Sequence, residues 1–555
     1  MNTSMDRRQF LALAASAAAG VSAWPTYRAY AQESGTKRPP NFLVIMADDI
    51  GAKELGCYGH PAHRTPHLDA LAQSGVQFQT CYATPICHPT RLMVMTGQYG
   101  CHNGVYNFAN RRGGPDPDDP VEDMTHHVNF AQLLKQQGYA TALAGKWQLS
   151  GEVPGLIHEC GFDEYLIWAY KHNLPAGVEH TGAWEGKKDG RTARYWHPSL
   201  MKNGEYVPTK PEDYGPDLHA DFLNDFVRRN RQRPFLAYFP MCLTHGPHLR
   251  TPDTKALEDP KYDRPPLVYQ GAVEYMDKIV GRLVAVLDEL GLRESTVVLF
   301  TGDNGTGGDG KGDPTELGAR VPMIVNGPGI VKARGATGEL TDLSDVLPTL
   351  CDFAAAPLPA DRPIDGHSLA PFLCGDTGQT REWIFSYIGD RRILRTQRWL
   401  LEDNSPLHYG RLYDCGDSRN GSGYREVTES EDIEVLAIKE RFNALLEQLP
   451  APYIAEEGDA AGDKLASNDA GGGQSRTEAA RERKKRREKE QQKQEEKEKA
   501  DEEERQRRED DRPDAERPRR KRYYERRRQS QEQQKQQSQP QQQNQGSTKT
   551  ETERR

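Results

Sequence analysis

Four continuous apolar runs constrain the fold of this 555-residue chain more than any other feature. They read NFLVIMADD, PFLAYFPMCLTHGPH, VVLFTGDNG and VPMIVNGPG, and each ends in polar or glycine-rich residues. Runs of this length without alternation suit central strands that are covered on both faces. Between them, YMDKIVGRLVAVLDELG spaces its apolar residues three and four apart, as one face of a helix does, and stops at Gly291. The pattern predicts an α/β protein with a large, mostly parallel central sheet.

The pattern changes after about Leu373. Short strand-like pieces follow, WIFSYIG, RRILRTQRWLLED and RLYDCGD, and then a helix-like segment, EDIEVLAIKERFNALLEQL. We expect a small C-terminal α+β subdomain over residues 374–455, packed on a main domain over residues 38–373. From about Ala455 apolar residues nearly vanish, and mixed charge gives way to glutamine, which predicts a disordered tail over residues 456–555. Such a tail accounts for a hydrophobic content of only 35%.

The first 31 residues are typical of an export signal. Arg7 and Arg8, followed by Phe10 and Leu11, match a bacterial twin-arginine signal, with cleavage expected after Ala31. The Ala-rich run behind them is shorter than the roughly 20 residues that a bilayer span needs, although an uncleaved helical anchor is the alternative. We expect a periplasmic or extracellular protein, carried by the twin-arginine machinery, with no stable membrane insertion. The formal net charge of −9 gives no reason to expect nucleic acid as a partner.

Polar residues follow two of the apolar runs directly. They comprise three carboxylates and one amide: Asp48, Asp49, Asp303 and Asn304. Ligands of open α/β sheets bind at the carboxyl ends of strands, and an all-oxygen set suits Ca²⁺ or Mg²⁺. The alternative is that each pair only ends a strand or caps a helix. Sequence spacing alone cannot bring the two pairs together.

The stretch GTGGDGKG, from Gly305 to Gly312, matches the glycine and lysine positions of a phosphate-binding loop. It carries Gly312 where Ser or Thr should bind Mg²⁺, so a nucleotide site is not expected. Lys311 remains a candidate charge for an anion.

The stretch CHPTR, with Cys87, Pro89 and Arg91 followed by Thr96 and Gly97, resembles the signature of the type I sulfatases. Six further stretches resemble that family in the same order: ADD, TPHLDALAQSG, GKW, HGPH, TGDNG and LGARVP. The resemblance covers about residues 40 to 415. It implies an alkaline-phosphatase-like fold and hydrolysis of sulfate esters.

The resemblance implies that Cys87 is oxidised to Cα-formylglycine by a formylglycine-generating enzyme. The aldehyde hydrate would supply one oxygen to attack sulfur and a second hydroxyl to expel sulfate afterwards. Asp48, Asp49, Asp303 and Asn304 would bind the divalent cation, usually Ca²⁺, together with the modified Cys87 side chain. Formylglycine enzymes of this kind act on unfolded chains, whereas the twin-arginine route carries folded ones, so we expect modification in the cytoplasm before export.

The remaining site residues also follow from the resemblance. Arg91, Lys146 and Lys311 match fixed cations around the formylglycine and the sulfate. His245 matches the histidine that contacts sulfate and can protonate the leaving oxygen, and His248 is a candidate neighbouring substrate contact.

Two departures from the family pattern bear on the chemistry. The family usually reads GKWHLG, whereas this chain reads GKWQLS, so Gln148 replaces a histidine that helps take a proton from the formylglycine hydroxyl. Gln148 can form a hydrogen bond there but cannot act as a base. Thr90 stands where serine is commoner, which keeps the hydroxyl.

These residues predict an exported sulfuric ester hydrolase that acts on sulfated saccharides. A phosphoester or phosphonate hydrolase of the same superfamily is the first alternative. A non-catalytic protein that binds sulfated glycans is the second, supported by Gln148.

Substrate specificity is expected in the stretch 172–213 and in the C-terminal subdomain. That stretch holds Trp184, Tyr195, Trp196 and His197. These aromatic side chains could stack on sugar rings or simply anchor the loop. The nine cysteines form no recognisable framework, and no disulfide pairing is predicted.

Overall fold

The computed structural model describes residues 38–108, 124–149, 155–169, 174 and 192–452, all within one compact unit that spans Met1–Ile454. The predicted export signal and the predicted tail lie outside the described residues, as does part of the stretch 172–213. No helix within the described ranges has the length and apolar character needed to cross a membrane.

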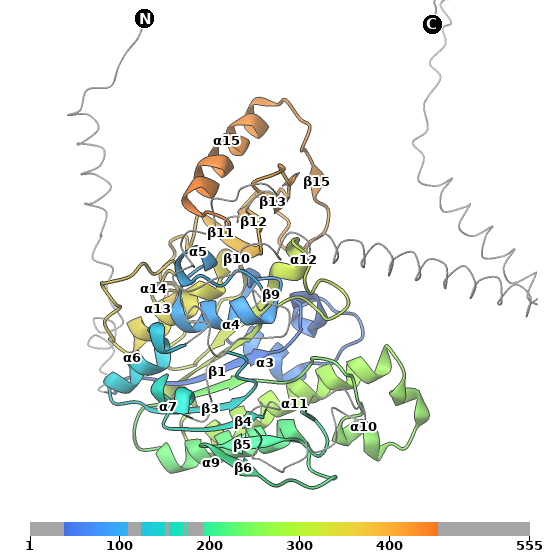
Figure 1. Ribbon diagram of the computed structural model, residues 1–555, viewed down its shortest axis with the longest axis vertical. Helices are drawn as coiled ribbons and strands as arrows, with labels where there is room; N and C mark the ends of the chain where they lie inside the picture. The colour runs from blue at the N-terminus through green and yellow to red at the C-terminus, as the bar shows by residue number, and fades with distance from the viewer. Residues whose placement is uncertain (1–37, 109–123, 150–154, 170–173, 175–191, 453–555) are drawn as a thin grey trace, which may run out of the picture. The chain divides into compact units, whose positions relative to one another are not determined.

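A ten-stranded sheet forms the centre of this unit (Figure 1), in the order β10-β2-β9-β8-β1-β7-β3-β4-β5-β6. Its strands are β1 (Asn41–Ala47), β2 (Val76–Tyr82), β3 (Ala140–Gly145), β4 (Glu164–Trp168), β5 (Leu200–Lys202), β6 (Glu205–Val207), β7 (Phe235–Pro240), β8 (Thr296–Gly302), β9 (Arg320–Asn326) and β10 (Gly335–Asp342). The central strands β8, β1, β7, β3 and β4 are parallel to one another. The predicted α/β fold with a large, mostly parallel sheet is confirmed.

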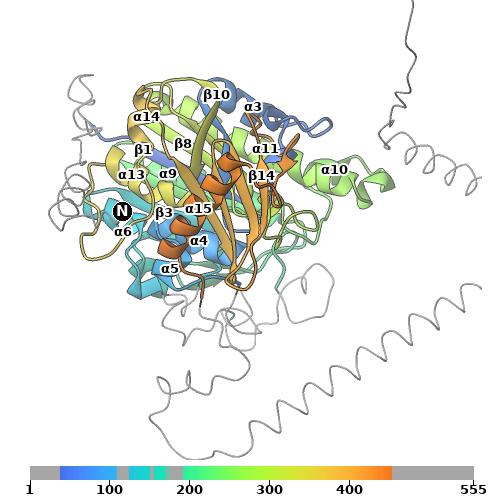
Figure 2. The same cartoon turned by 90° about the horizontal axis from the view of Figure 1, so that it is seen from above.

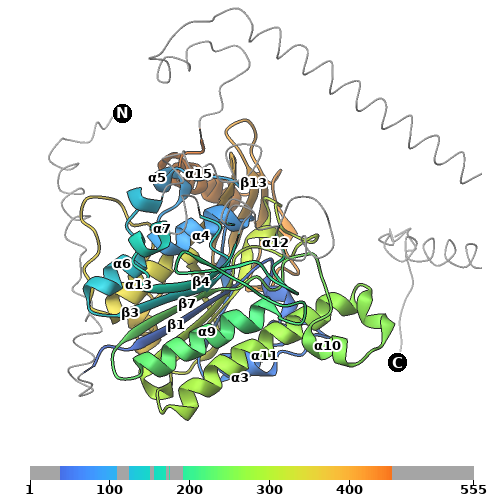
Figure 3. The same ribbon diagram turned by 60° about the horizontal axis from the view of Figure 1, so that its bottom comes forward.

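Helices cover both faces of this sheet (Figure 3). The α-helices are α3 (Pro66–Gln73), α4 (Cys87–Thr96), α5 (Gly100–Asn103), α6 (Phe130–Gln136), α7 (Gly155–Glu159), α9 (Gly215–Asn230), α10 (Pro252–Ala256), α11 (Leu267–Glu289), α12 (Glu316–Ala319), α13 (Val346–Phe353), α14 (Ala370–Cys374) and α15 (Ile433–Gln448). Short 3₁₀ helices are η1 (Ala52–Glu54), η2 (Gly56–Tyr58), η3 (Met124–His126), η5 (Pro260–Asp263), η6 (Arg293–Ser295) and η7 (Leu343–Asp345).

Strand β1 shows why its sequence is apolar from Phe42 to Ala47, after Asn41, whose amide donates to Thr296 Oγ1 at 3.2 Å. Phe42, Val44 and Met46 point into a core shared with α4, α6 and α13, whereas Leu43 and Ile45 point into a second core shared with α3, α9 and α11. Successive side chains of a strand face opposite ways, so a strand covered on both faces is apolar at nearly every position. The two cores hold the carboxyl end of β1 in place, directly before Asp48.

Two predicted elements differ from the structure in detail. The run VPMIVN forms β9, which is antiparallel to both neighbours, β8 and β2. A continuous apolar run reports burial on both faces and not strand direction, which explains the difference. The predicted helix at residues 275–291 begins earlier, because α11 starts at Leu267.

The C-terminal residues form a second, antiparallel sheet, as predicted for the small α+β subdomain. It contains β11 (Trp383–Ile388), β12 (Arg391–Thr396), β13 (Trp399–Asn404), β14 (Arg411–Asp414) and β15 (Arg425–Glu426). Figure 2 shows α15 lying across this sheet, and its apolar side chains share a core with Leu394, Leu401 and Leu412. The opposite face of the sheet packs on Tyr82 and Leu340 of the main domain. The domain boundaries drawn from the sequence remain a prediction.

Candidate active site

The segment that contains Cys87 is a loop followed by a buried helix. Helix α4 begins at Cys87, with Pro89 in its first turn, where proline is tolerated, and ends at Thr96, directly before Gly97, which has a φ of 68°. The hydroxyl of Thr90 lies 2.7 Å from that of Thr84 and 2.9 Å from the Thr84 amide nitrogen, which donates to it. These contacts hold the loop against the helix, so the Cys87 thiol is fixed at the buried start of α4.

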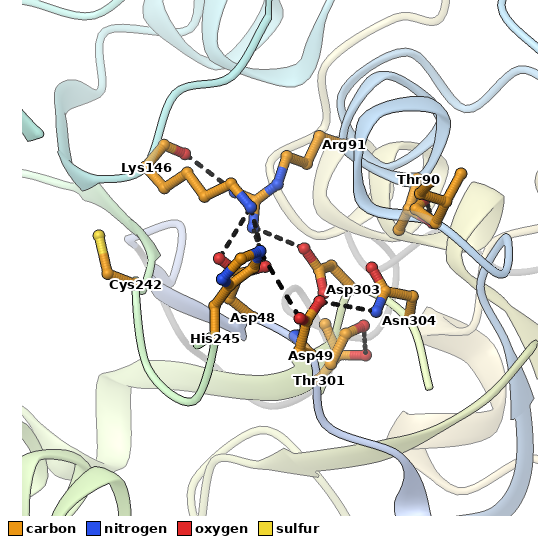
Figure 4. Close-up of polar contacts among 12 residues, drawn as sticks. Asp48, Asp49, Thr90, Arg91, Lys146, Cys242, His245, Thr301, Asp303 and Asn304 are labelled. Atoms are coloured by element: carbon orange, nitrogen blue, oxygen red, sulfur yellow. Dashed lines mark hydrogen bonds and ion pairs between the residues drawn. The ribbon is translucent and has the colours of Figure 1, made fainter. Parts of the chain in front are cut away.

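The four predicted oxygen donors come together at the carboxyl ends of β1 and β8 (Figure 4). These strands are parallel neighbours, with Ala47 opposite Gly302. The Asp49 amide donates to Asp303 Oδ1 at 2.9 Å, and Asn304 Nδ2 donates to Asp49 Oδ1 at 2.9 Å. Asp49 has a φ of 59°, a left-handed conformation that turns the chain sharply after the strand.

Cys87 belongs to the same cluster. Its Sγ atom and one carboxylate oxygen each from Asp48 and Asp303 lie within 4.8 Å of one another. Asn304 Oδ1 is buried and has no hydrogen-bond partner among the described residues. A buried amide oxygen without a donor is costly unless something electropositive faces it. Three carboxylates and this oxygen therefore fit a hard divalent cation.

Three cations surround the carboxylates. Arg91 Nη2 donates to Asp303 Oδ2 at 2.6 Å, Lys146 Nζ donates to both oxygens of Asp48, and Lys311 Nζ donates to Asp49 Oδ1 at 2.6 Å. Arg91 lies one helical turn after Cys87, so both side chains project from the same face of α4. All three cations predicted from the sequence therefore face the carboxylate cluster.

These charges set the ionisation of the carboxylates. Burial alone would raise the pKa of Asp48, but Lys146, His245, Arg91 and Lys311 together hold it well below its usual value. Burial and the neighbouring charge of Asp48 raise the pKa of Asp303 to about 7, against the opposing effect of Arg91. Two close carboxylates cannot both ionise easily without a cation between them.

His245 follows β7 and faces the same cluster. Its Nε2 lies 3.6 Å from Asp49 Oδ2, and its Nδ1 donates to the Gly246 carbonyl at 2.6 Å. Burial, with the charges of Arg194 and Lys146, lowers the pKa of His245 to about 3, although Asp48 and Asp49 oppose that shift. A carbonyl can only accept, so Nδ1 carries a proton, and Nε2 is the ring nitrogen that faces the cluster.

The last two site residues predicted from the sequence, Gln148 and His248, differ in burial. Gln148 is buried with a φ of 52°, and its Oε1 has no hydrogen-bond partner within the described part of the chain. His248 is half-buried and packs on Tyr269, with ring centroids 4.9 Å apart.

Hydrogen bonds hold the loop that carries Lys311 at two points. The Gly312 amide donates to the Pro85 carbonyl at 2.7 Å, two residues before Cys87. Farther along, Glu316 accepts hydrogen bonds from Tyr82 at 2.8 Å and from Arg395 of the small sheet at 2.9 Å. The loop ends in a four-residue helix, α12, so the glycine-rich stretch does not open a long helix as a nucleotide-binding loop would.

Two aromatic residues of the stretch 172–213 anchor the loop 241–250, which carries His245 and is called here the histidine loop. The Tyr195 hydroxyl donates to the Cys242 carbonyl at 2.9 Å and also contacts the His245 carbonyl oxygen. Trp196 Nε1 donates to the Arg250 carbonyl at 2.8 Å. Of the two readings left open by the sequence, anchoring holds for Tyr195 and Trp196, whereas Trp184 lies outside the described residues.

Arg194 is a site residue that the sequence did not reveal. It precedes Tyr195, is buried, and places Nη1 4.0 Å from Asp48 Oδ2. It lies in a polar stretch with no strand or helix periodicity, so no local pattern marks it. Only the return of this stretch to the carboxylate cluster identifies it.

Comparisons with known proteins agree with this geometry. A family model described as "Sulfatase" matches residues 40–356. The steryl-sulfatase of Mus musculus is 34% identical over 449 residues, covering 65% of this chain and 69% of the relative. The arylsulfatase A of Homo sapiens is 33% identical over 378 residues, covering 63% of this chain and 71% of the relative.

The same fold occurs in the crystal structure of Ps i-CgsB in complex with k-i-k-neocarrahexaose. The TM-score is 0.62 at 23% identity, covering 77% of this chain and 97% of that one. At this identity the likeness shows the fold. Together with the family match over most of the main domain, it establishes that this chain belongs to the sulfatase family, whose enzymes hydrolyse sulfate esters.

Proposed function

We propose that this chain is a formylglycine-dependent sulfatase that binds Ca²⁺ and cleaves sulfate esters of saccharides. One observation carries the proposal: the Cys87 thiol shares a buried cluster with Asp48 and Asp303, at the start of a helix that also presents Arg91. In the structure the thiol stands in for the formylglycine hydrate. A structural cysteine would be surrounded by apolar groups, and this one is surrounded by charges.

The divalent cation would be held by Asp48, Asp49, Asp303, Asn304 and the modified side chain of Cys87. When bound, it would polarise the sulfate and favour ionisation of the hydrate. The unsatisfied Asn304 Oδ1 and the raised pKa of Asp303 both support a cation at this position. Mg²⁺ has the same ligand chemistry and is the alternative metal.

The fixed cations orient the substrate. Lys146 and Lys311 each contact a carboxylate of the cluster, and an ammonium group has three donors, so each can also donate to sulfate oxygens. Arg91 is committed to Asp303 and to the Lys146 carbonyl at 2.9 Å, which makes it a positioning residue. Removing one preorganised donor of this kind typically costs about 10²- to 10³-fold in rate.

His245 is the proposed proton carrier for the leaving oxygen, a role that requires a second proton on Nε2, since Nδ1 already donates to Gly246. The hydrogen bond from Nδ1 to Gly246 fixes the ring so that Nε2 faces the cluster. Gln148 takes the place of the second histidine of the family and would hydrogen-bond the formylglycine hydroxyl through its amide. His248, three residues after His245 and half-buried, is proposed as a neighbouring substrate contact.

Saccharide specificity is supported by analogy with Ps i-CgsB, which was crystallised with an oligosaccharide. Export is supported by the twin-arginine pattern at residues 1–31. We propose maturation by a formylglycine-generating enzyme in the cytoplasm, then transport to the periplasm or beyond. Aldehyde that appears only outside the cytoplasm would contradict that order.

The first test is mass spectrometry of the peptide that contains Cys87, from protein made in a host that converts a control sulfatase. An aldehyde or its hydrate at Cys87, with turnover of an aryl sulfate that is lost in Cys87→Ala, would support the proposal. A plain thiol in that host would contradict it. Faster turnover of an aryl phosphate or phosphonate would favour the phosphoester reading, and tight sulfate binding without any release would favour the non-catalytic one.

A further inference from the structure

The loop of residues 305–319, called here the lysine loop, carries Lys311 between β8 and β9. Near its middle, Lys311 Nζ donates to Asp49 Oδ1 at 2.6 Å, which places the ammonium group at the carboxylate cluster. At its far end the loop forms α12, which is bonded to the small C-terminal sheet. One loop therefore joins a proposed sulfate donor to the second subdomain.

Glu316, the first residue of α12, is the point where the C-terminal subdomain holds the lysine loop. Its Oε1 atom accepts from Arg395 Nη1 of β12 at 2.9 Å, and its Oε2 atom accepts from the Tyr424 hydroxyl at 2.7 Å. Its amide donates to Glu402 Oε1 of β13 at 2.6 Å. Three residues of the subdomain therefore bind one residue of the loop.

Arg395 is the centre of this attachment. Its side chain is 0% exposed, and its guanidinium also donates to the Tyr424 hydroxyl and to the Ser418 carbonyl, both at 2.9 Å. A buried ion pair often stabilises a protein no more than apolar side chains of the same volume do. A guanidinium bonded in three directions does fix the position of its partner, because its planar N–H groups point in set directions. Glu316 is therefore held at one place relative to the small sheet.

The backbone of α12 packs directly on the residue before Lys311. The carbonyl oxygen of Leu317, the residue after Glu316, lies so close to Gly310 that a Cβ atom there would overlap it. Gly310 directly precedes Lys311 in the chain. A shift of α12 would therefore be passed to the Lys311 backbone and would move its ammonium group relative to Asp49.

We propose that Arg395 is a positioning residue for Lys311: by holding Glu316, it sets where the Lys311 ammonium group meets the sulfate of the substrate. This inference rests on the proposed function, in which Lys311 donates to sulfate oxygens. The C-terminal subdomain then takes part in binding the sulfate group itself, besides the substrate specificity expected of it from the sequence. Arg395 acts on the substrate only through the lysine loop.

The test is a double-mutant cycle on the binding of inorganic sulfate, measured by calorimetry. It uses the Ca²⁺-loaded full chain with an unmodified Cys87 thiol, so the result is independent of formylglycine formation. Lys311→Met should weaken sulfate binding about 10- to 100-fold, the value of a charge-assisted hydrogen bond. Arg395→Met should weaken it about 3- to 10-fold, because the same bond is then displaced and only partly lost.

The cycle separates positioning from a merely structural role. In a Lys311→Met background, Arg395→Met should weaken sulfate binding by less than about twofold, since the group that it positions is gone. A structural role would give the same loss in both backgrounds, because independent effects add. The matched control is Arg381→Met: Arg381, two residues before β11, is also buried, but it donates to both oxygens of Asp345 at 2.9 Å. The control should bind sulfate as the wild type does, even where its Tm falls as far.

Arg395→Lys keeps the charge but not the set directions of the guanidinium, so its affinity should lie between those of the wild type and Arg395→Met. It replaces the methionine variant in the cycle if that variant does not fold. Wild-type affinity in the variant that is used, or equal losses in the two backgrounds, would overturn the proposal. Loss of folding in both variants would also overturn it, because Arg395 would then belong to the framework.

The two proposals fail in different ways. If Cys87 is never converted to the aldehyde but the cycle still couples Arg395 to Lys311, the proposed function fails and the positioning role stands. If the mature enzyme cleaves aryl sulfates and the cycle shows no coupling, the inference about Arg395 fails alone. Wild-type affinity in Lys311→Met would overturn that inference as well, since there would be no donor to position.

Discussion

Lys146 Nζ donates to both carboxylate oxygens of Asp48, at 2.9 and 2.8 Å, across the strand that separates them in the sheet. Asp48 follows β1, Lys146 follows β3, and β7 lies between these two strands. The Lys146 amide donates to the Pro240 carbonyl at the end of β7, at 2.7 Å. This hydrogen bond fixes the Lys146 backbone, from which the side chain extends past the end of β7 to Asp48. One ammonium group therefore neutralises a proposed metal ligand before any metal binds.

Replacing Lys146 by methionine should make the protein depend more on calcium. The side chain keeps its length, but the buried Asp48 carboxylate loses its hydrogen-bonded partner, which typically costs about 3–5 kcal/mol. Ca²⁺ compensates for the lost charge, so the rise in Tm on adding Ca²⁺ should be larger in Lys146→Met than in the wild type. Lys278→Met, which removes an exposed pair with Asp253, is the control. Equal rises in Tm would place the metal away from Asp48.

Calcium affinity should weaken at acid pH. Asp303 has a folded-state pKa raised to about 7 in the metal-free protein, and Ca²⁺ needs its ionised form. The Kd for Ca²⁺ should therefore rise about tenfold for each pH unit below 7 over the first unit or two, measured by calorimetry. In Asp303→Asn the pH dependence should be much smaller and the affinity lower throughout. A Kd that stays constant between neutral and mildly acid pH would remove Asp303 from the ligand set.

Restoring the histidine at position 148 should speed the release of sulfate. A general base typically contributes about 10²- to 10⁴-fold, and Gln148 cannot accept a proton. Gln148→His should raise kcat on an aryl sulfate and add a basic group to its pH profile near neutrality. Gln148→Asn, which shortens the amide without adding a base, should not. Unchanged kcat in Gln148→His would mean that another group already takes this proton.

Removing the Tyr195 hydroxyl should slow the enzyme by loosening the histidine loop. Tyr195→Phe takes away the donor to the Cys242 and His245 carbonyls, and an unsatisfied buried carbonyl costs about 1–3 kcal/mol. We expect a lower Tm and a lower kcat, with little change in the Kd for inorganic sulfate. Trp196→Phe removes the bond to Arg250 and leaves a smaller ring against Lys255 and Tyr214, without touching the His245 carbonyl, so it serves as the comparison. A weaker affinity for sulfate in Tyr195→Phe would instead place the hydroxyl against the substrate.

Glu402 should make the protein less stable as pH rises toward neutrality. Burial raises the pKa of Glu402 to about 7, although the Glu316 amide donates to it at 2.6 Å. Because this pKa lies above the unfolded value of about 4.3, the folded state holds the extra proton between those values. The free energy of unfolding therefore falls as pH rises from about 4.5 to 7, by at most about 3 kcal/mol from this group.

Glu402→Gln should flatten that part of the curve, since the amide oxygen still accepts the bond from Glu316 and carries no charge. Urea unfolding across the pH range measures the effect. Glu382→Gln is the control, because Glu382 is exposed and pairs only with Arg441 among the described residues. Parallel curves for the wild type and Glu402→Gln would show that Glu402 has an ordinary pKa.

The amino-acid sequence by itself determined the local elements and most of the site chemistry. The run NFLVIMA is β1, VVLFTG lies within β8, and the polar residues that follow these two strands are the carboxylates and the amide of the cluster. Burial and helix periodicity depend on the type of each successive residue. The motifs that contain Cys87, Lys146 and His245 can also be recognised in the sequence alone.

Only the tertiary structure decided which segments meet. It paired β1 with β8, so that the Asp49 amide bonds Asp303 from 254 positions away, and it turned β9 antiparallel. It also returned the stretch before β5 to the cluster, which placed Arg194 beside Asp48 and brought the Tyr195 hydroxyl to the His245 carbonyl. The physical reason is that an apolar run specifies how deeply a strand is buried, whereas its neighbours depend on how all ten strands and their helices pack together.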